Sequence, residues 1–215
     1  MKKPRKPHKP YILLNSAMSL DGRIGGINER IRFSNQLDKE RVHKLRTEVD
    51  AVMIGVNTVL VDDPHLTVKY AEGKNPVRIV VDSSARTPPG ARILNEKAKT
   101  IIAVSDAAGK NNIEILRKYA EVVIVENDRN NRINLKKLLA ILYEKGIKKI
   151  LLEGGGTLNR SMLEEGLVDE IFIAVAPVIV GGGVNLVEGN LVEKINLKFK
   201  DLLMLEDRIV LHYTI

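Results

Sequence analysis

The chain of 215 residues contains no cysteine and no tryptophan, and aromatic residues make up 4% of it. The absence of cysteine excludes disulfides, thiolate metal sites, cysteine nucleophiles and iron–sulfur clusters. The scarcity of aromatic residues argues against platforms on which nucleic-acid bases stack. No apolar run approaches the ~18 residues that a membrane span needs, and no apolar segment of a signal peptide follows the basic start. We therefore expect a soluble, cytoplasmic protein that does not bind a membrane.

Basic residues gather at the start of the chain. The sequence holds 34 lysine and arginine residues against 27 aspartate and glutamate residues, a formal net charge of +7. Residues 1–10 contain five of the basic residues and no acidic one, which leaves 29 basic against 27 acidic residues in the rest. With its three prolines, this stretch is typical of an extended, solvated arm, and an RNA-binding arm is the alternative. The nearly balanced remainder predicts no nucleic-acid-binding face.

Short apolar segments alternate with amphipathic ones after the arm, and we interpret residues 11–215 as one domain. The apolar segments predict strands at 11–14, 51–56, 77–81, 100–104, 122–125, 147–152 and 171–180. The intervening segments predict helices at 35–48, 111–120, 135–144 and 157–165, the first of them capped by Ser34.

This alternation is typical of βαβ units, so the fold class is α/β with a mainly parallel central sheet and helices on both faces. The last two apolar runs, 195–203 and 207–214, have no helix between them and predict an antiparallel hairpin that completes the sheet. In such sheets ligands bind at the carboxyl ends of the strands. The segments that directly follow the predicted strands are therefore the places to search for a site.

The most informative segment is a glycine-rich turn at 153–157, which follows one predicted strand and opens a helix. Three consecutive glycines let the backbone approach an anion, and the helix start offers unpaired amides. This pattern predicts a phosphate cradle, and a tight strand-to-helix turn is the alternative. The spacing matches neither the dinucleotide-binding fingerprint nor the P-loop. A second glycine triplet at 181–183 predicts either another cradle or a plain loop.

Two further segments follow the first two predicted strands. Residues 15–22 are small and polar, which suits a surface against which a flat ligand lies, although Asp21-Gly22 is equally typical of a turn. Residues 55–67 bring a hydroxyl, Thr58, together with the carboxylates of Asp62 and Asp63. Paired carboxylates are typical of metal or acid–base chemistry, while Asp63-Pro64 also predicts the start of a turn.

The fourth segment, 81–86, places Ser83, Ser84 and Arg86 after a predicted strand. Hydroxyls and a guanidinium at this position can hold a phosphate, for example the 2′-phosphate of an adenine dinucleotide, and a solvated loop is the alternative. We predict no metal site, because His8, His43 and His212 have no partner at metal-ligand spacing.

Taken in order, the segments SLDGRI, HKLRTEVDAVMIGVNTVLVDDPHLTV, RIVVDSSAR and LLEGGGTLNRSMLEEGLVDEIFIAVAPVIVGG resemble the riboflavin-biosynthesis reductases. This family comprises stand-alone archaeal and fungal reductases and the carboxyl-terminal part of the bacterial bifunctional deaminase-reductase. The resemblance covers essentially everything after residue 10. It implies a dihydrofolate-reductase-like fold, NADPH as cofactor, and reduction of a ribosylaminopyrimidine phosphate to its ribitylamino product.

The resemblance also implies roles for individual residues. The resemblance identifies residues 155–161 as the phosphate-binding loop. Together with the segments above, it implies that the cofactor is bound by Ala17, Thr58, Asp62, Ser83, Ser84, Gly154, Gly155, Gly156, Thr157, Leu158 and Asn159. The residues expected to bind the substrate are Arg46, Leu66, Lys69 and Glu153. Lys69 stands where the bacterial pattern has arginine, and Arg32-Phe33 stands where it has Trp-Ile. Arg30 and Arg32 are candidate substitutes for the phosphate contact, and solvated surface charges are the alternative.

The absence of cysteine also excludes an attached zinc deaminase, so the chain is similar to the stand-alone reductases. The expected substrate is 2,5-diamino-6-(5-phosphoribosylamino)pyrimidin-4(3H)-one. The deaminated uracil analogue, another pterin or pyrimidine, and a non-catalytic nucleotide- or RNA-binding role are the alternatives. No proton donor stands out. Asp62 and Glu153 are the acids expected near the reacting atoms, and we expect both to have contact roles. The resemblance further implies a homodimer, which we expect to involve the last ~40 residues, where the terminal strands begin.

Overall fold

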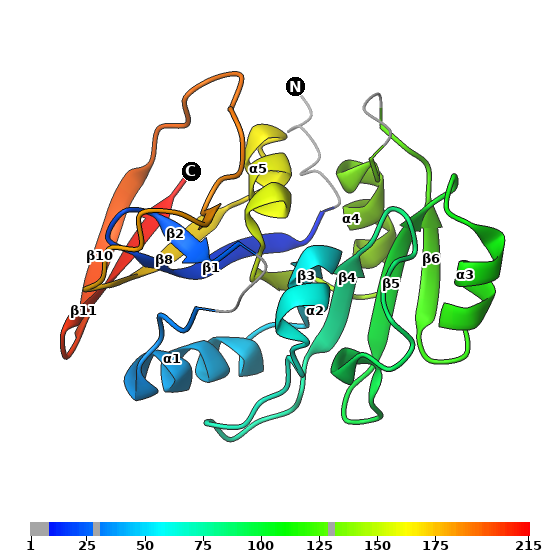
Figure 1. Ribbon diagram of the computed structural model, residues 1–215, viewed down its shortest axis with the longest axis horizontal. Coiled ribbons are helices and arrows are strands. Elements are labelled where there is room, and N and C mark those ends of the chain that lie inside the picture. Colours follow the sequence, from blue (N-terminus) through cyan, green and yellow to red (C-terminus); the bar gives the residue numbers. More distant parts are fainter. Residues whose placement is uncertain (1–8, 28–30, 129–131) are drawn as a thin grey trace, which may run out of the picture.

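A nine-stranded sheet forms the centre of the computed structural model, which describes residues 9–27, 31–128 and 132–215 (Figure 1). Its strands are β1 Tyr11–Ser19, β3 Ala51–Gly55, β4 Val77–Val81, β5 Thr100–Ser105, β6 Glu121–Val125, β7 Lys149–Leu152, β8 Glu170–Ala176, β10 Lys198–Leu205 and β11 Arg208–Thr214. The helices are α1 Gln36–Thr47, α2 Val56–Asp62, α3 Lys110–Leu116, α4 Leu135–Glu144 and α5 Gly156–Glu164, with a 3₁₀ turn at Arg92–Leu94. Two short strands, β2 Arg23–Gly25 and β9 Val184–Asn185, pair with each other outside the main sheet.

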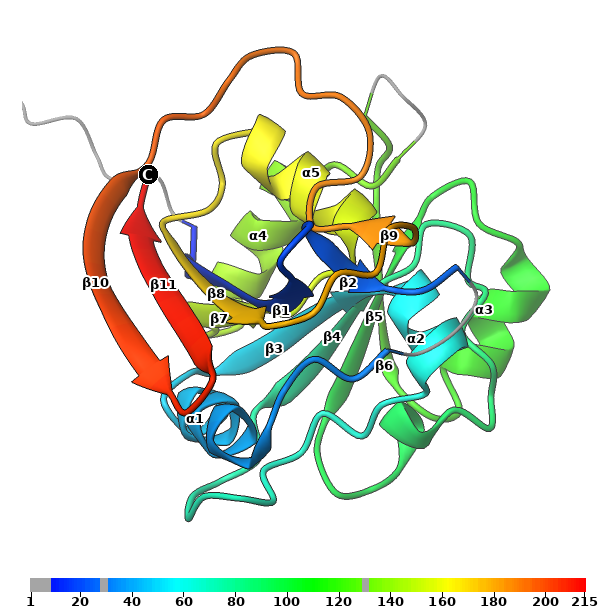
Figure 2. The same cartoon turned by 60° about the vertical axis from the view of Figure 1, so that its left-hand side comes forward.

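The strand order in the main sheet is β10-β11-β8-β1-β7-β3-β4-β5-β6. Every neighbouring pair from β8 to β6 is parallel, whereas β11 is antiparallel to both β8 and β10. The mainly parallel sheet and the terminal antiparallel hairpin are therefore confirmed. Figure 2 shows this hairpin at one edge of the sheet, away from α2 and α3.

Helices cover both faces of the sheet, as the sequence predicts. Successive strand residues alternate between the faces. Ile12 and Leu14 of β1 belong to the core that packs against α4 and α5. Leu13 between them belongs to the opposite core, which includes residues of α2 and α3. Because both faces are buried, the parallel strands are mainly apolar, with buried exceptions such as Arg78 of β4 and Asn15 of β1, and this composition made them predictable.

Several predicted boundaries are wrong for physical reasons. β1 continues to Ser19 instead of ending at residue 14, because its second half pairs in register with β8. β8 ends at Ala176 because Pro177 has no amide to donate to the ladder. α3 ends at Leu116, earlier than predicted. The cap of α1 is Asn35 and not Ser34, since the Asn35 side chain accepts the Asp38 amide.

The last two residues of the predicted arm, Lys9 and Pro10, pack against the body of the protein. Of the predicted arm, residues 1–8 lie outside the described residues. Pro10 is buried, and Lys9 forms an ion pair with Asp169, its Nζ 2.7 Å from the carboxylate oxygen. Within the described ranges, none of the helices combines the length and the apolar character that a membrane span requires.

Candidate functional site

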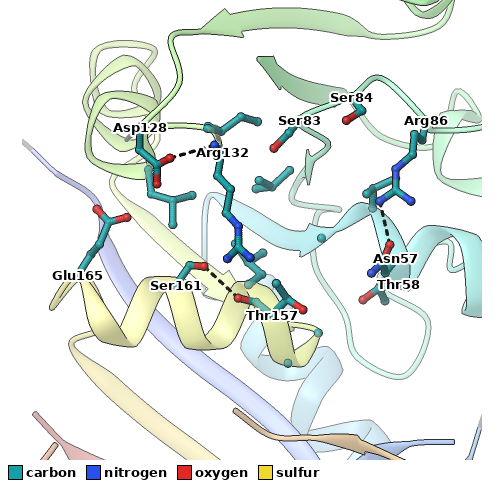
Figure 3. Close-up of a pocket in the computed structure, with 18 residues that line it drawn as sticks. Asn57, Thr58, Ser83, Ser84, Arg86, Asp128, Arg132, Thr157, Ser161 and Glu165 are labelled. Atoms are coloured by element: carbon teal, nitrogen blue, oxygen red, sulfur yellow. Dashed lines mark hydrogen bonds between the residues drawn. The ribbon is translucent and has the colours of Figure 1, made fainter. Parts of the chain in front are cut away.

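A first cavity, of about 280 Å³, opens at the carboxyl ends of β3 and β4, beside the start of α5. Its walls combine apolar side chains with hydroxyl, amide and guanidinium groups (Figure 3). The apolar lining consists of Val56, Val81, Ile133, Leu135 and Leu158. The polar lining consists of Asn57, Thr58, Ser83, Ser84, Arg86, Asp128, Arg132, Thr157, Ser161 and Glu165, with Gly55, Gly155 and Gly156 contributing backbone. Such a mixture suits a nucleotide, which needs an apolar slot and anchored phosphates.

Each of the three glycines in the turn after β7 has a different reason to be glycine. Gly154 has a φ of +88°, a conformation that other residues rarely adopt. At Gly156, a Cβ atom would collide with the backbone carbonyl oxygen of Asn185. At Gly155, a Cβ would meet nothing nearer than the hydroxyl oxygen of Thr58, at 3.4 Å, on the cavity wall. Close approach of a ligand to the backbone is therefore the reason that remains for glycine at position 155.

The turn leads directly into a helix start that carries no side-chain cap. Gly155 is the N-cap residue of α5 and makes no capping hydrogen bond through a side chain. The first amides of a helix have no intrahelical acceptor, and together with the helix dipole they attract an anion. Gly156, Thr157 and Leu158 of this first turn line the cavity. This arrangement is what the predicted phosphate cradle requires.

The other end of the first cavity is formed by the segment that follows β4. Ser83, Ser84 and Arg86 all line it, as the sequence predicts they should if they act together. The Arg86 guanidinium is held by α2, since its Nη2 donates to Asn57 Oδ1 over 2.9 Å. Two hydroxyls and an oriented guanidinium can bind a phosphate by charge-assisted hydrogen bonds.

A second cavity, of about 260 Å³, lies between β1, α1 and the residue after β7. Its charged lining residues are Arg32, Asp38, Lys39, Arg46, Asp62 and Glu153. Its other lining residues are Asn15, Ser16, Ala17, Ile31, Phe33, Ser34, Val42 and His43. The structure therefore brings Arg46 and Glu153, both expected to bind substrate, into one cavity with Ala17 and Asp62, which are expected to bind cofactor. Arg32 and Phe33, which replace the bacterial Trp-Ile, also lie on its wall.

Arg46 and Glu153 form an ion pair on the wall of the second cavity. Arg46 Nε and Nη2 lie 2.8 and 2.7 Å from the two carboxylate oxygens of Glu153, and Nη1 donates to the carbonyl oxygen of Thr67. Burial opposes the charge on Arg46, but the Glu153 carboxylate outweighs that effect and raises the pKa of the guanidinium. The guanidinium thus stays charged, and the two hydrogen bonds hold the pair as a fixed polar wall.

His43 lies on the same wall and is neutral at physiological pH. Burial, reinforced by the positive charge of Arg46, lowers the pKa of His43 to about 4. Its Nδ1 accepts the backbone amide of Lys69, 2.8 Å away, which leaves Nε2 as the protonated nitrogen of the ring. The sequence assigned no role to His43, because a lone histidine in an amphipathic helix carries no signal.

Asn15 is oriented by a buried charged pair on α1. Asp38 is fully buried and accepts two hydrogen bonds from Arg41. Arg41 Nη2 in turn donates to Asn15 Oδ1 over 2.8 Å. The carbonyl end of the Asn15 amide is therefore engaged, and its nitrogen is the end that remains for the second cavity.

Two short segments contribute to both cavities and so join them. On α2, Thr58 lines the first cavity and Asp62, one helical turn later, lines the second. In the turn after β7, Gly155 lines the first cavity and Glu153 lines the second. A ligand that spans the two cavities would therefore touch residues that are near neighbours in the sequence.

Four expected site residues do not line either cavity. The Gly154 carbonyl oxygen accepts the Gly55 amide over 2.7 Å, which ties the glycine turn to the end of β3, and the Asn159 side chain donates to the Leu186 carbonyl oxygen, which ties α5 to the segment after β9. Leu66 is buried in the core at a φ of 49°. Lys69 lies beside Tyr70, its Nζ 5.1 Å from the ring centroid. Arg30 lies outside the described residues.

The second glycine triplet forms a loop outside both cavities. The Asp21 carboxylate accepts the amides of Val180 and Gly181, which fastens this loop to the turn after β1. Residues 181–183 thus form bends, and Asp21 lies in a turn, while Asn15, Ser16 and Ala17 of the same segment line the second cavity. Among the residues that the structure describes, no group of three or more potential ligands is arranged around a metal site.

Comparisons with known proteins identify relatives over nearly the whole chain. The model of the RibD C-terminal domain matches residues 10–211. The 2,5-diamino-6-ribosylamino-4(3H)-pyrimidinone 5′-phosphate reductase of Methanothermobacter thermautotrophicus is 46% identical over 216 residues, which cover 96% of this chain and 99% of that protein.

Solved structures share the fold. A deaminase/reductase from Thermotoga maritima has a TM-score of 0.79 at 24% identity. The match covers 96% of this chain, which spans 56% of that longer protein. The riboflavin biosynthesis reductase Rib7 of Saccharomyces cerevisiae has a TM-score of 0.76 at 21% identity, covering 99% of this chain and 92% of that one. These neighbours agree with the expected dihydrofolate-reductase-like architecture.

Proposed function

Because the chain belongs to the RibD C-terminal domain family, we propose that it is the NADPH-dependent reductase that converts 2,5-diamino-6-ribosylamino-4(3H)-pyrimidinone 5′-phosphate to its ribitylamino product. Its similarity to the Methanothermobacter reductase along the full length of both chains supports the non-deaminated pyrimidine as substrate. The reaction serves riboflavin biosynthesis.

The observation that carries this proposal is the junction of two cavities at the turn after β7. Glu153 lines the second cavity, and Gly155, two residues later, lines the first. A redox cofactor and its substrate must meet with their reacting atoms in contact, and a shared turn brings their sites together. The first cavity suits the adenosine half of a dinucleotide, and the second suits the pyrimidine.

The residues of the first cavity fit a phosphorylated dinucleotide. We assign the pyrophosphate to the amides at 155–158 and the 2′-phosphate to Ser83, Ser84 and Arg86. Thr58 on α2 contacts the cofactor between them, and Asp62 and Ala17 contact it where it enters the second cavity. When bound, the nicotinamide supplies a hydride for C1′ of the ring-opened ribosylamine.

The residues of the second cavity position the substrate. The Arg46–Glu153 pair offers a fixed edge for hydrogen bonds to the pyrimidine, and the Asn15 amide offers a donor. Arg32 and Lys39 line this cavity, and we assign the substrate phosphate to these two cations. Lys69 is not assigned this role, because it does not line the cavity. We assign contact roles to Asp62 and Glu153, and water supplies the proton that completes the amine.

The test of this proposal is NADPH oxidation with two substrates. We expect the purified protein to oxidise NADPH with the diaminopyrimidinone phosphate at least about tenfold more efficiently than with its deaminated uracil analogue, a difference of roughly 1.4 kcal/mol in transition-state binding. Preference for the uracil analogue would reassign the substrate. Oxidation with dihydrofolate, and with neither ribosylaminopyrimidine, would identify a different pterin reductase.

We also propose that the protein is a homodimer in the cytoplasm. β10 is the last strand at one edge of the sheet, and seven of its eight residues are exposed. Its exposed apolar side chains include Phe199, Leu202, Leu203 and Met204. An unpaired edge with an apolar face favours association with a second copy.

A further inference from the structure

Arg132 is a cavity residue that no motif in the sequence singles out. It lies in the connection between β6 and α4, 22 residues before Gly154 in the chain, yet it lines the same first cavity as the glycine turn. Figure 3 shows its side chain extending from the wall opposite α5, with the guanidinium directed toward the Thr157 end of that helix. The cavity therefore has a second arginine besides Arg86.

The backbone of Arg132 is firmly held. Its amide donates to Asp128 Oδ1 over 2.9 Å, and the Asp128 amide donates to the carbonyl oxygen of Arg132 over 2.6 Å. The flanking residues Asn127 and Ile133 form an antiparallel bridge, and Ile133 is buried in the core. The root of the side chain is thus fixed relative to the cavity.

The direction of this side chain makes sense if an anion lies in front of it. The start of α5 carries a partial positive charge and has amides without intrahelical acceptors. A guanidinium directed at it repels it unless a negative group lies between them. The carboxylates on the cavity wall are those of Asp128 and Glu165, and Glu165 follows the opposite end of α5. Neither belongs to the helix start.

We propose that Arg132 holds the cofactor pyrophosphate against the first turn of α5, as a cationic clamp on the side facing the glycine turn. The proposal rests on the proposed function, because it presumes a dinucleotide in the first cavity. It separates the two arginines by role. Arg132 binds the group that NADPH and NADH share, whereas Arg86, held by Asn57 at the other end of the cavity, binds the 2′-phosphate that distinguishes them.

The two roles predict different binding patterns for matched variants. The experiment titrates NADPH and NADH into the wild type and into R132Q, R86Q and R117Q, and follows the fluorescence of the reduced nicotinamide. R117Q is the control, because Arg117 lies next to α3 and pairs with Glu114 outside the cavity. We expect R132Q to weaken both cofactors about tenfold and to leave their affinity ratio unchanged. We expect R86Q to weaken NADPH chiefly, and R117Q to change neither.

The outcomes distinguish this inference from the function on which it rests. Unchanged binding of both cofactors to R132Q would overturn the clamp, and a loss confined to NADPH would mean that Arg132 binds the 2′-phosphate instead. Binding of neither cofactor by the wild type would overturn the proposed function. A denaturation midpoint for each variant checks folding, and R132K, which keeps the charge without the two-pronged geometry, replaces R132Q if that variant does not fold. An intermediate loss in R132K for both cofactors supports the clamp, and no loss opposes it.

Discussion

Arg46 and Glu153 lie 107 positions apart in the sequence and form an ion pair through two hydrogen bonds on the wall of the second cavity. Their side chains are 12% and 14% exposed, so water screens the contact little. The pair ties α1 to the carboxyl end of β7, and the glycine turn begins at the very next residue. One contact therefore sets the position of the proposed substrate edge relative to the proposed phosphate cradle.

Removing either partner of this pair leaves a charge buried without its counterion. We expect Arg46→Gln and Glu153→Gln each to lower the free energy of unfolding by about 3 kcal/mol, as urea denaturation measures it. The double variant, which has neither charge, should lose much less than the sum of the two single variants. Additive losses would show that the two residues act independently.

Gly155 is the glycine whose replacement should affect binding more than folding. A Cβ there fits at an ordinary contact distance, so Gly155→Ala and Gly155→Val should both fold. The branched side chain of valine would stand where the phosphate approaches the backbone, and NADPH affinity should fall at least about tenfold, roughly 1.4 kcal/mol. Alanine should lose less.

Gly156→Ala provides the contrast to that prediction, because its Cβ meets the Asn185 carbonyl oxygen and should destabilise the fold itself. Thermal unfolding and NADPH titration of all three variants separate the two effects. Unchanged affinity in a folded Gly155→Val protein would move the phosphate site away from this turn.

The depressed pKa of His43 should appear in the pH dependence of stability. The pKa is about 4 in the folded protein and near 6.5 when the histidine is exposed, so between these values the unfolded chain binds the extra proton. Stability contributed by neutral His43 is present above pH 6.5 and is lost as the pH falls toward 4. Because the side chain is partly exposed, we expect the loss to be on the order of 1 kcal/mol.

The variant that tests this prediction is His43→Asn, whose side-chain oxygen can still accept the Lys69 amide. Urea denaturation at pH 4, 5.5 and 7 should show that the wild type loses more stability on acidification than the variant. Equal losses in the two proteins would mean that His43 does not contribute to the acid sensitivity.

The exposed hairpin at the edge of the sheet makes the dimer testable. Light scattering at micromolar concentration should give twice the chain mass of 23.9 kDa. Leu203→Glu combined with Ile209→Lys should yield a folded monomer, because both exposed apolar side chains lie on the hairpin. Ile124→Glu is the control, since Ile124 is equally exposed but lies on β6 at the opposite edge. A dimer that survives the hairpin changes would place the interface elsewhere.

Sequence patterns best predicted the strands and helices whose formation depends on residues that are close in the sequence. The parallel strands are buried on both faces and stand out as apolar runs, and α4 and α5 begin and end close to the predicted positions. Ser34 and Asn35 are both good caps, and composition does not choose between them. The helix α2 was not predicted, because its seven residues include three valines, which favour strands when considered alone.

The candidate site was predictable where a motif follows a strand, and not where the fold brings distant residues together. Ser83, Ser84 and Arg86 adjoin a strand end and do share one cavity. Arg132 comes from a connection without a motif, and His43 from a helix that resembles an ordinary surface helix. Glycine runs were ambiguous for a further reason. In the triplet after β7, Gly154 is required by its positive φ and Gly156 by close packing, whereas Gly155 lies on an open cavity wall. The sequence cannot distinguish these three reasons.

In the proposed reaction, a nicotinamide cofactor in the first cavity reduces C1′ of a substrate in the second. The most direct measurement uses NADPH deuterated at both C4 positions, with the diaminopyrimidinone phosphate as substrate, followed by mass spectrometry and NMR of the product. We expect one deuterium per molecule of ribitylamino product, located at C1′, and one equivalent of NADPH consumed. NADPH consumption without deuterium at C1′, or no consumption by the folded protein, would contradict it.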